Sequence, residues 1–161
     1  MKNYWFVLLA VLIGFASCEK SKVDQRDAFV GTYDYVTEGE MTFGTFVPGI
    51  DPTLPLDTEG TYKISKLGDK DTVLISEAID GKLDPFKAVV KGNKLEFVQD
   101  EFGAKSQNFE VVLTIDNKIA VLENDTLSWE ADNVLCVGKF LGITIEGEGY
   151  VTMKSTKKAL K

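Results

Sequence analysis

Apolar and polar residues alternate with a period of two along several short runs of this chain. The clearest run is residues 108–115, where Phe109, Val111, Leu113 and Ile115 alternate with mainly polar neighbours. A period of two places successive side chains on opposite faces, so the run predicts a strand with one buried face. Other runs of strand length predict further strands at residues 29–37, 61–67, 72–78, 86–91, 94–99, 118–122, 127–131, 134–137 and 142–154.

Turn-forming residues separate these runs. Asp80-Gly81 and Gly92-Asn93 are typical of two-residue hairpin loops. No run with a helical period lies between the strands, whereas parallel pairing would need crossover connections of a dozen or more residues. We therefore predict an all-β fold, an antiparallel up-and-down meander closed into a barrel of eight to ten strands, with a β-sandwich as the alternative.

Two local features modify this pattern. Gly147 and Gly149 interrupt the last predicted strand and favour a bulge or a sharp bend there. Residues 24–30 are the best candidate for helical structure, as a short turn that leads into the first strand. An eight-stranded barrel is just wide enough to hold one small ligand.

The beginning of the chain has the three parts of a secretory signal peptide. Lys2 precedes an apolar run of 13 residues, 4–16, and small residues follow before Cys18. The run is shorter than the roughly 20 residues of a permanent transmembrane helix. The sequence Phe15-Ala16-Ser17-Cys18 resembles the lipobox of bacterial lipoproteins, in which the cysteine thiol is acylated and becomes the new N-terminus. The alternative is an ordinary signal peptide cut near Ala16.

The lipobox resemblance implies a signal peptide over residues 1–17 and a lipidated Cys18. The polar residues that follow predict a tether, so residues 18–27 form one segment, and the strand pattern places the barrel domain over residues 28–161. The resemblance also implies attachment to a membrane through the lipid. Glu19 stands where an Asp retains many such proteins at the inner membrane, so we expect an outer-membrane lipoprotein that faces the periplasm or the cell surface.

Charge and composition exclude several classes of function. Removal of residues 1–17 takes away one basic residue, Lys2, and leaves 17 basic against 25 acidic residues, a net charge of −8. Nucleic-acid binders carry basic patches, so nucleic acid is not an expected partner. The chain has no histidine, which excludes Ser-His-Asp and Cys-His catalysis and almost every zinc site. No pair among the acids is singled out for catalysis, so we predict a non-enzyme without cofactor or metal.

A second resemblance concerns the start of the predicted domain. Residues 26–33, Arg-Asp-Ala-Phe-Val-Gly-Thr-Tyr, resemble the opening of lipocalin-like (calycin) domains, in which a short turn leads into Gly-x-Trp or Gly-x-Tyr on the first strand. The resemblance implies that Tyr33 closes one end of the barrel and that Lys154 replaces the usual Arg of the last strand. The residues themselves predict that Cys136, in an apolar run, is buried and inert.

A long segment, residues 39–60, interrupts the series of strands. It contains three of the four prolines of the chain, at positions 48, 52 and 55, together with many apolar residues. It is therefore either a lid over the barrel mouth or a surface that docks on another protein. The alternative is that residues 40–47 are the second strand and the remainder plugs the barrel. The candidate contacts for a ligand or partner are Phe43, Phe46, Ile50, Leu54 and Trp129.

These observations lead to two hypotheses of function. The first is a membrane-anchored, non-enzymatic module that binds a small apolar or amphipathic ligand inside the barrel. The second is an envelope protein with a filled core that uses the long segment to bind another protein. The size of the internal cavity separates them, because a ligand pocket needs roughly 300 Å³ or more.

Overall fold

The computed structural model describes residues 23–44, 52–68, 71–77, 84–106, 109–140 and 142–159. Within these ranges the chain forms strands apart from one short helix. In chain order the elements are η1 (Gln25–Ala28), β1 (Gly31–Phe43), β2 (Thr53–Pro55), β3 (Thr58–Lys66), β4 (Thr72–Glu77), β5 (Phe86–Lys91), β6 (Lys94–Phe97), β7 (Glu101–Ser106), β8 (Phe109–Ile115), β9 (Ile119–Glu123), β10 (Thr126–Phe140) and β11 (Ile143–Lys157). None of the helical structure in these ranges is long and apolar enough to cross a bilayer.

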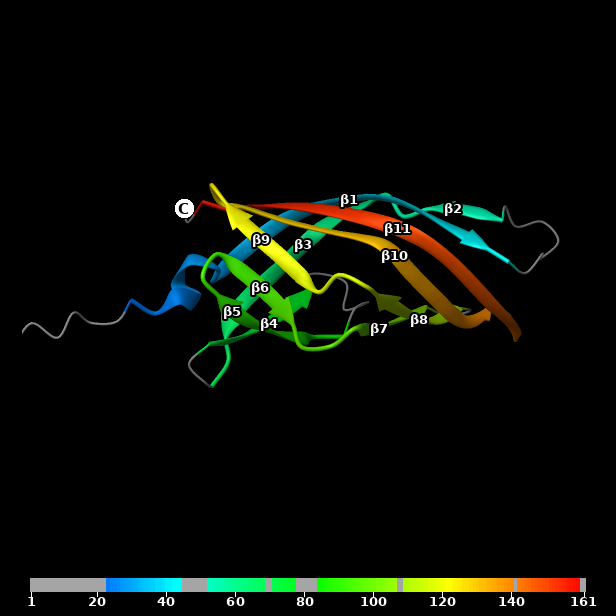
Figure 1. Ribbon diagram of the computed structural model, residues 1–161, viewed down its shortest axis with the longest axis horizontal. Coiled ribbons are helices and arrows are strands. Elements are labelled where there is room, and N and C mark those ends of the chain that lie inside the picture. The colour runs from blue at the N-terminus through cyan, green and yellow to red at the C-terminus, as the bar shows by residue number, and fades with distance from the viewer. Residues whose placement is uncertain are drawn as a thin grey trace, which may run out of the picture.

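Eight of the described strands form a closed antiparallel barrel, in the order β11-β1-β3-β4-β5-β6-β9-β10 (Figure 1). The ring closes because β10 pairs with β11 along most of its length. Around the ring the eight strands follow one another in sequence order, so the barrel has up-and-down connections. The predicted all-β barrel is confirmed, and closure of the ring excludes the sandwich alternative. Closure also removes exposed strand edges from the ring.

The remaining strands extend this barrel. The first part of β10 pairs with β9, and its second part pairs with β8, which in turn pairs with β7. Residues 127–131 and 134–137, predicted as separate strands, are one strand with a register shift between Ala131 and Val134. Strand β7 was not predicted, because its sequence EFGAKS has little apolar alternation.

The bulge predicted at the glycines of the last strand lies on its partner, because the register of β10 with β11 shifts between Ala131 and Val134, opposite Val151 and Gly149. Strand β11 keeps an unbroken register with β1 from Gly147 to Lys157, so no bulge interrupts this pairing. A Cβ atom on Gly149 would lie 2.0 Å from the carbonyl oxygen of Glu40. Glycine is needed at this position because the backbones of β1 and β11 approach too closely for any side chain.

The long segment divides differently from the alternative drawn from the sequence. Residues 40–43 are the end of β1 rather than the start of a second strand, and β2 folds back to pair with them. Among the described residues β2 pairs only with β1, so Pro55 occupies an edge position where no hydrogen-bond donor is required. Residues 45–51 lie outside the described ranges.

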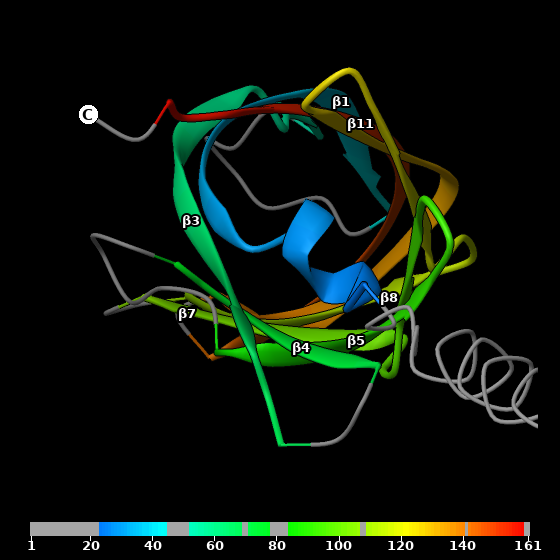
Figure 2. The ribbon, with the colours of Figure 1, turned by 90° about the vertical axis from the view of Figure 1, so that its left-hand side faces the viewer.

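One end of the barrel is closed by η1, which lies across the ring of strands in Figure 2. Phe29, directly after η1, is fully buried, and its carbonyl oxygen accepts a hydrogen bond of 2.9 Å from the Tyr33 hydroxyl. Burial raises the pKa of Tyr33 to about 12. Tyr33 therefore lies at a closed end, as the calycin resemblance implies.

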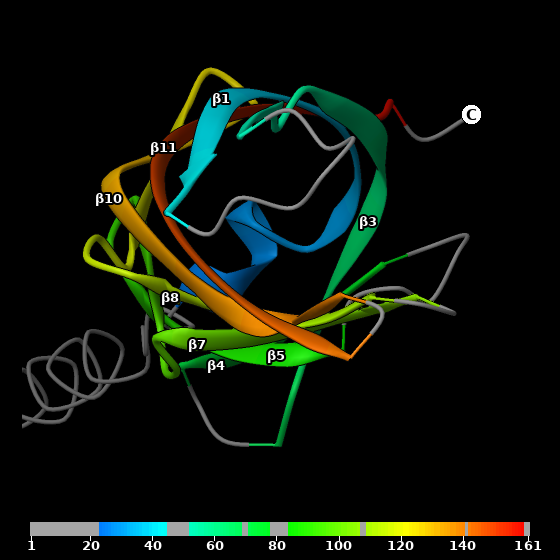
Figure 3. The same cartoon turned by 90° about the vertical axis from the view of Figure 1, so that its right-hand side faces the viewer.

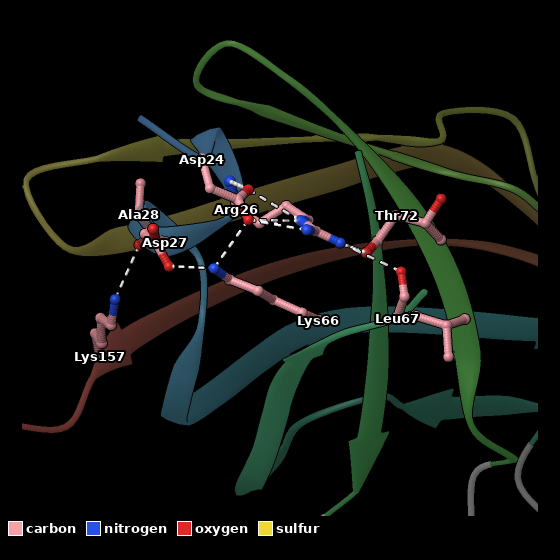
Figure 4. Close-up of polar contacts among 8 residues, drawn as sticks. All are labelled: Asp24, Arg26, Asp27, Ala28, Lys66, Leu67, Thr72 and Lys157. Carbon is pink, nitrogen blue, oxygen red and sulfur yellow. Dashed lines mark hydrogen bonds and ion pairs between the residues drawn. The ribbon is translucent and has the colours of Figure 1, made fainter. Parts of the chain in front are cut away.

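A basic residue of β11 does lie at this end, but it is not Lys154. Lys154 is exposed, whereas Lys157 Nζ donates a hydrogen bond of 2.9 Å to the carbonyl oxygen of Ala28 (Figure 4). The aliphatic part of Lys157 crosses Gly31, where a Cβ would lie 2.7 Å from Lys157 Cε. The expectation was wrong because Lys154 is on the outward-facing set of β11 positions.

Charged side chains fix η1 to the neighbouring strands (Figure 4). Arg26 forms an ion pair of 2.8 Å with Asp24 and donates a hydrogen bond of 3.3 Å to the carbonyl oxygen of Leu67. Lys66 of β3 lies 2.9 Å from the same Asp24 carboxylate. Arg26 and Lys66 together hold the pKa of Asp24 well below its usual range. The helix η1 is the plug of this end of the barrel, and side chains from both elements thus join it to β3.

Candidate functional site

A cavity of about 350 Å³ lies inside the barrel. Strands from all sides of the ring and from the β7–β8 extension contribute to its wall. Its described lining consists of Tyr35, Thr37, Leu56, Thr58, Tyr62, Ile75, Phe86, Phe97, Phe102, Leu113, Ile115, Leu127, Trp129, Val134, Val151 and Met153. The volume is within the range of small-molecule pockets.

A row of tyrosines forms one wall, on β1 and β3. The Tyr62 ring stacks on Tyr33, with centroids 5.3 Å apart, and lies 5.8 Å from the Tyr35 ring. Tyr35 covers Gly60 on the neighbouring strand, where a Cβ atom would lie 2.7 Å from its ring. The absence of a side chain at position 60 therefore gives the Tyr35 ring its place beside the cavity.

Two hydroxyl groups are buried in this wall without a hydrogen bond of ordinary geometry, those of Tyr62 and Ser155. Burial raises the pKa of Tyr62, and the Ser155 hydroxyl opposes the rise only in part. Both oxygens have almost no accessible surface, so they lie beneath the cavity wall and do not face into the cavity. Unpaired hydroxyls cost folding free energy, about 1–3 kcal/mol each.

Aromatic rings form the opposite wall. Phe86 meets Phe97 and Phe102 edge to face, with ring centroids 5.4 Å and 5.1 Å apart. Phe97 also meets Trp129, with ring centroids 5.9 Å apart. The Trp129 indole N–H donates a hydrogen bond of 2.8 Å to the carbonyl oxygen of Asn117. Because its one polar group is satisfied there, Trp129 offers an apolar ring to the cavity.

Threonines connect the long segment to the cavity wall. Thr37 Oγ1 donates to the carbonyl oxygen of Leu56 at 2.7 Å and accepts from the Thr58 N–H at 3.1 Å. The Leu56 N–H donates to the carbonyl oxygen of Gly39 at 2.9 Å. Residues 56–58 are thereby held along β1, with Leu56 and Thr58 in the cavity lining.

The cavity is uncharged throughout its described lining. Within the described ranges, no three His, Cys, Asp or Glu residues are grouped so that they could hold a metal ion. The wall offers apolar and aromatic surface, together with a few hydroxyls. This arrangement can hold an apolar molecule by burial and ring contacts, and it presents no facing pair of carboxyls to a substrate.

The structure separates the five contact residues predicted from the sequence. Trp129 lines the cavity. Phe43 packs against the core and over Gly147, where a Cβ would lie 2.8 Å from Phe43 Cδ1, and it is not in the described lining. Leu54 is 44% exposed on β2. Phe46, Ile50 and the lipid-attachment candidate Cys18 lie outside the described residues.

The sequence reasoning missed most of the lining. Tyr35 and Tyr62 lie on predicted strands, and a period of two from Tyr33 would have placed Tyr35 on the same inner face. Phe86 and Phe97 also lie on predicted strands, but their meeting depends on how the ring closes. Phe102 could not be found, because β7 was not predicted.

Cys136 lies on β10 beyond the cavity lining. It is 2% exposed, and burial raises the pKa of its thiol. Its side chain is on the inward-facing side of β10, and Cys136 pairs with Leu113 of β8. These findings agree with the prediction of a buried side chain.

No family model and no curated protein matches this chain.

Proposed function

We propose that this protein is a membrane-anchored, lipocalin-like binding module for a small apolar or amphipathic ligand. The observation that carries the proposal is the cavity of about 350 Å³ with its aromatic and aliphatic wall. Burial of apolar ligand surface is favourable by roughly 25 cal/mol per Å². A cavity already formed in the folded protein supplies this gain without reorganisation of the core.

The lipocalin-like part of the proposal is supported by the eight-stranded ring, by η1 across one end, and by Tyr33 beside that plug. The anchor is supported by the lipobox resemblance at residues 15–18 and the polar tether that follows. We place the lipid on Cys18 and the protein at the outer membrane, facing the periplasm or the cell surface.

A protein-docking module is the second candidate, and a specific observation favours it. Val112 and Val137 are paired across β8 and β10 and are 42% and 53% exposed. Leu135, on the same face of β10, is 46% exposed. This alternative needs no cavity, so ligand binding inside the barrel distinguishes the two candidates.

The test of ligand binding is titration with N-phenylnaphthylamine, an uncharged apolar dye whose fluorescence rises in dry surroundings. Val151→Trp places a large ring in the cavity, because Val151 is part of the lining on β11. Thr156→Trp is the matched control, since Thr156 is exposed on the same strand. We expect saturable dye binding to the full chain and to Thr156→Trp, and at least about ten-fold weaker binding to Val151→Trp.

Circular dichroism and thermal melting show whether each variant is folded. If Val151→Trp does not fold, Leu113→Phe replaces it, because Leu113 lines the cavity from another strand, β8. Dye binding that survives in the folded, filled variant would refute the cavity as the site, as would the absence of saturable binding to the unchanged protein.

The anchor is tested separately, with Cys18→Ala. The unchanged protein should enter the detergent phase, whereas the variant should remain soluble or accumulate as uncleaved precursor. Unchanged partitioning into detergent would refute acylation of Cys18. This result does not depend on whether the barrel binds a ligand.

A further inference from the structure

The outer surface next to the cavity is acidic. Glu38, Glu40, Asp57, Glu59 and Glu148 are all exposed on β1, on its partners β3 and β11, or on the connection that follows β2. The backbone pairing places them within a few register positions of one another. The inner faces of the same strands carry part of the cavity lining.

Basic side chains at the end closed by η1 are held in local contacts. Lys66 pairs there with Asp24 and Asp27, and Lys157 reaches Ala28. In Figure 3, which looks along the barrel from the other end, η1 lies on the far side of the ring of strands. Among the five acidic residues lies one exposed base, Lys154, which pairs with Val36, so this surface keeps an excess of negative charge.

The described lining of the cavity has no Lys, Arg, Asp or Glu side chain, so none of its residues can neutralise a buried charge. The Trp129 N–H is bonded to Asn117, the Thr37 hydroxyl to Leu56, and the Tyr62 hydroxyl lies beneath the wall. A lone carboxylate or sulfonate buried here would lose its hydration without a replacement.

From these two observations we infer that the ligand is an uncharged molecule with an apolar, ring- or chain-shaped body, and that anionic amphiphiles are excluded. The inference rests on the proposed function and names the charge class of its ligand. The apolar body lies against Phe86, Phe97 and Trp129. Thr58 lines the cavity and is exposed to water, so a hydroxyl or carbonyl at the polar end of the ligand lies beside Thr58.

Anions meet two separate barriers in this arrangement. The acidic outer surface repels them within a Debye length, about 8 Å at physiological salt. A charged group that enters the uncharged interior loses its water shell, at a cost that does not depend on salt. An anionic group that stays beside Thr58 instead lies next to the exposed Asp57 and Glu59. A cation meets only the second barrier, so its binding should be intermediate between that of a neutral molecule and that of an anion.

The experiment uses two dyes that differ by one group. N-phenylnaphthylamine is neutral, and anilinonaphthalene sulfonate has the same rings with a sulfonate. Both are titrated into the full chain, into Val151→Trp and into Thr156→Trp, and the signal that remains in Val151→Trp is subtracted as surface binding. We expect the cavity to bind the neutral dye at least about ten-fold more tightly than the sulfonate.

Displacement of the neutral dye by decanol, decylamine and decanoate then compares the affinities of three ligands that share one alkyl chain and differ only in the head group. The expected order of affinity is decanol first, decylamine second and decanoate last, with at least about ten-fold between the first and the last. Decanoate that competes as well as decanol would overturn the inference, as would decylamine that competes better than decanol.

The two proposals fail in different ways. Equal binding of both dyes, lost from both in Val151→Trp, would leave the cavity as a binding site and refute its preference for uncharged ligands. Absence of saturable binding for either dye would refute the proposed function and this inference with it. Thr58→Val is a further check, since it should weaken the binding of decanol and leave the affinity for the neutral dye within about two-fold of that of the unchanged protein.

Discussion

The closed end of the barrel and its middle are built from the same alternating strands, yet only the end is filled. Phe29, Tyr33, Ile64 and Leu95 have 0% exposure around the plug. In the middle, larger rings stand around a cavity of about 350 Å³. The difference is that η1 brings an extra side chain, Phe29, into the ring at one end.

The two regions also differ in how polar groups are satisfied. At the closed end the Tyr33 hydroxyl bonds Phe29 and the Arg26 guanidinium bonds Asp24 and Leu67. In the wall next to the cavity, the Tyr62 and Ser155 hydroxyls lack such partners. Packing and polar satisfaction are therefore more complete at the end closed by η1, whereas the middle keeps unfilled volume and two hydroxyls without such partners.

The largest effect is expected from Tyr33→Ala at the closed end. The substitution removes a fully buried ring that stacks on Tyr62, together with the hydrogen bond to Phe29. We expect a loss of about 3–5 kcal/mol in the free energy of unfolding, measured by urea denaturation. Tyr33→Phe, the control, should lose only the hydrogen bond, about 1 kcal/mol. A near-native Tyr33→Ala would contradict the dense packing assigned to the plug.

Cys136 is buried outside the described cavity lining, and its substitution should have an intermediate effect. Cys136→Ser buries a hydroxyl in an apolar environment, at a cost of about 1–3 kcal/mol if it remains unpaired. In a Cys18→Ala background Cys136 is the only thiol of the chain, and a maleimide should label it slowly because it is 2% exposed. Rapid labelling of the folded protein would show that the cavity reaches past Val134 to Cys136 and would contradict the burial of this thiol.

A smaller effect is expected in the cavity wall. Met153→Ala removes a half-buried side chain that already has unfilled volume on one side. Such a side chain makes fewer contacts than one in a filled core, so we expect a loss below about 2 kcal/mol in the same denaturation experiment. A loss equal to that of Tyr33→Ala would show that the middle is as tightly packed as the end.

The smallest effect concerns the ion pairs of the plug and depends on pH. Arg26 and Lys66 lower the pKa of Asp24 in the folded protein. On acidification the unfolded chain therefore binds a proton first, so this stabilisation is complete above the usual carboxyl pKa and is lost as pH falls toward the folded value. Asp24→Asn should lower the Tm slightly at neutral pH, and the difference should shrink in acid. Glu59→Gln, at an exposed site, should show neither change.

Much of the fold could be predicted from the sequence, because alternation and turn dipeptides are local signals. Residues 109–115 and the hairpin at Gly92-Asn93 are found where they were expected. The strand β7 has no such signal, and the fusion of residues 126–140 into one bulged strand depends on two different partners, β9 and β8. Pairing with two partners is a property of the closed ring.

Less of the candidate site could be predicted. Trp129 was predicted as a contact and lines the cavity, whereas its contact with a ligand stays a prediction. Phe86 and Phe102 come together through pairings that no local pattern encodes. Lys157 takes the position expected for Lys154 because β11 extends three residues beyond the predicted strand end. Alternation along the sequence predicts which face of a strand a residue occupies. Which residues of distant strands come into contact depends on how the barrel closes.

The fluorescence of Trp129 reports directly on a ligand inside the barrel, because Trp129 lines the cavity. The chain has two tryptophans, Trp5 and Trp129, so Trp5→Phe leaves a single indole in the cavity wall. Titration of this protein with N-phenylnaphthylamine should quench Trp129 and give sensitised dye emission that saturates, and decanol should reverse both signals. Dye binding without a change in Trp129 emission, or no binding at all, would contradict a ligand site inside the barrel.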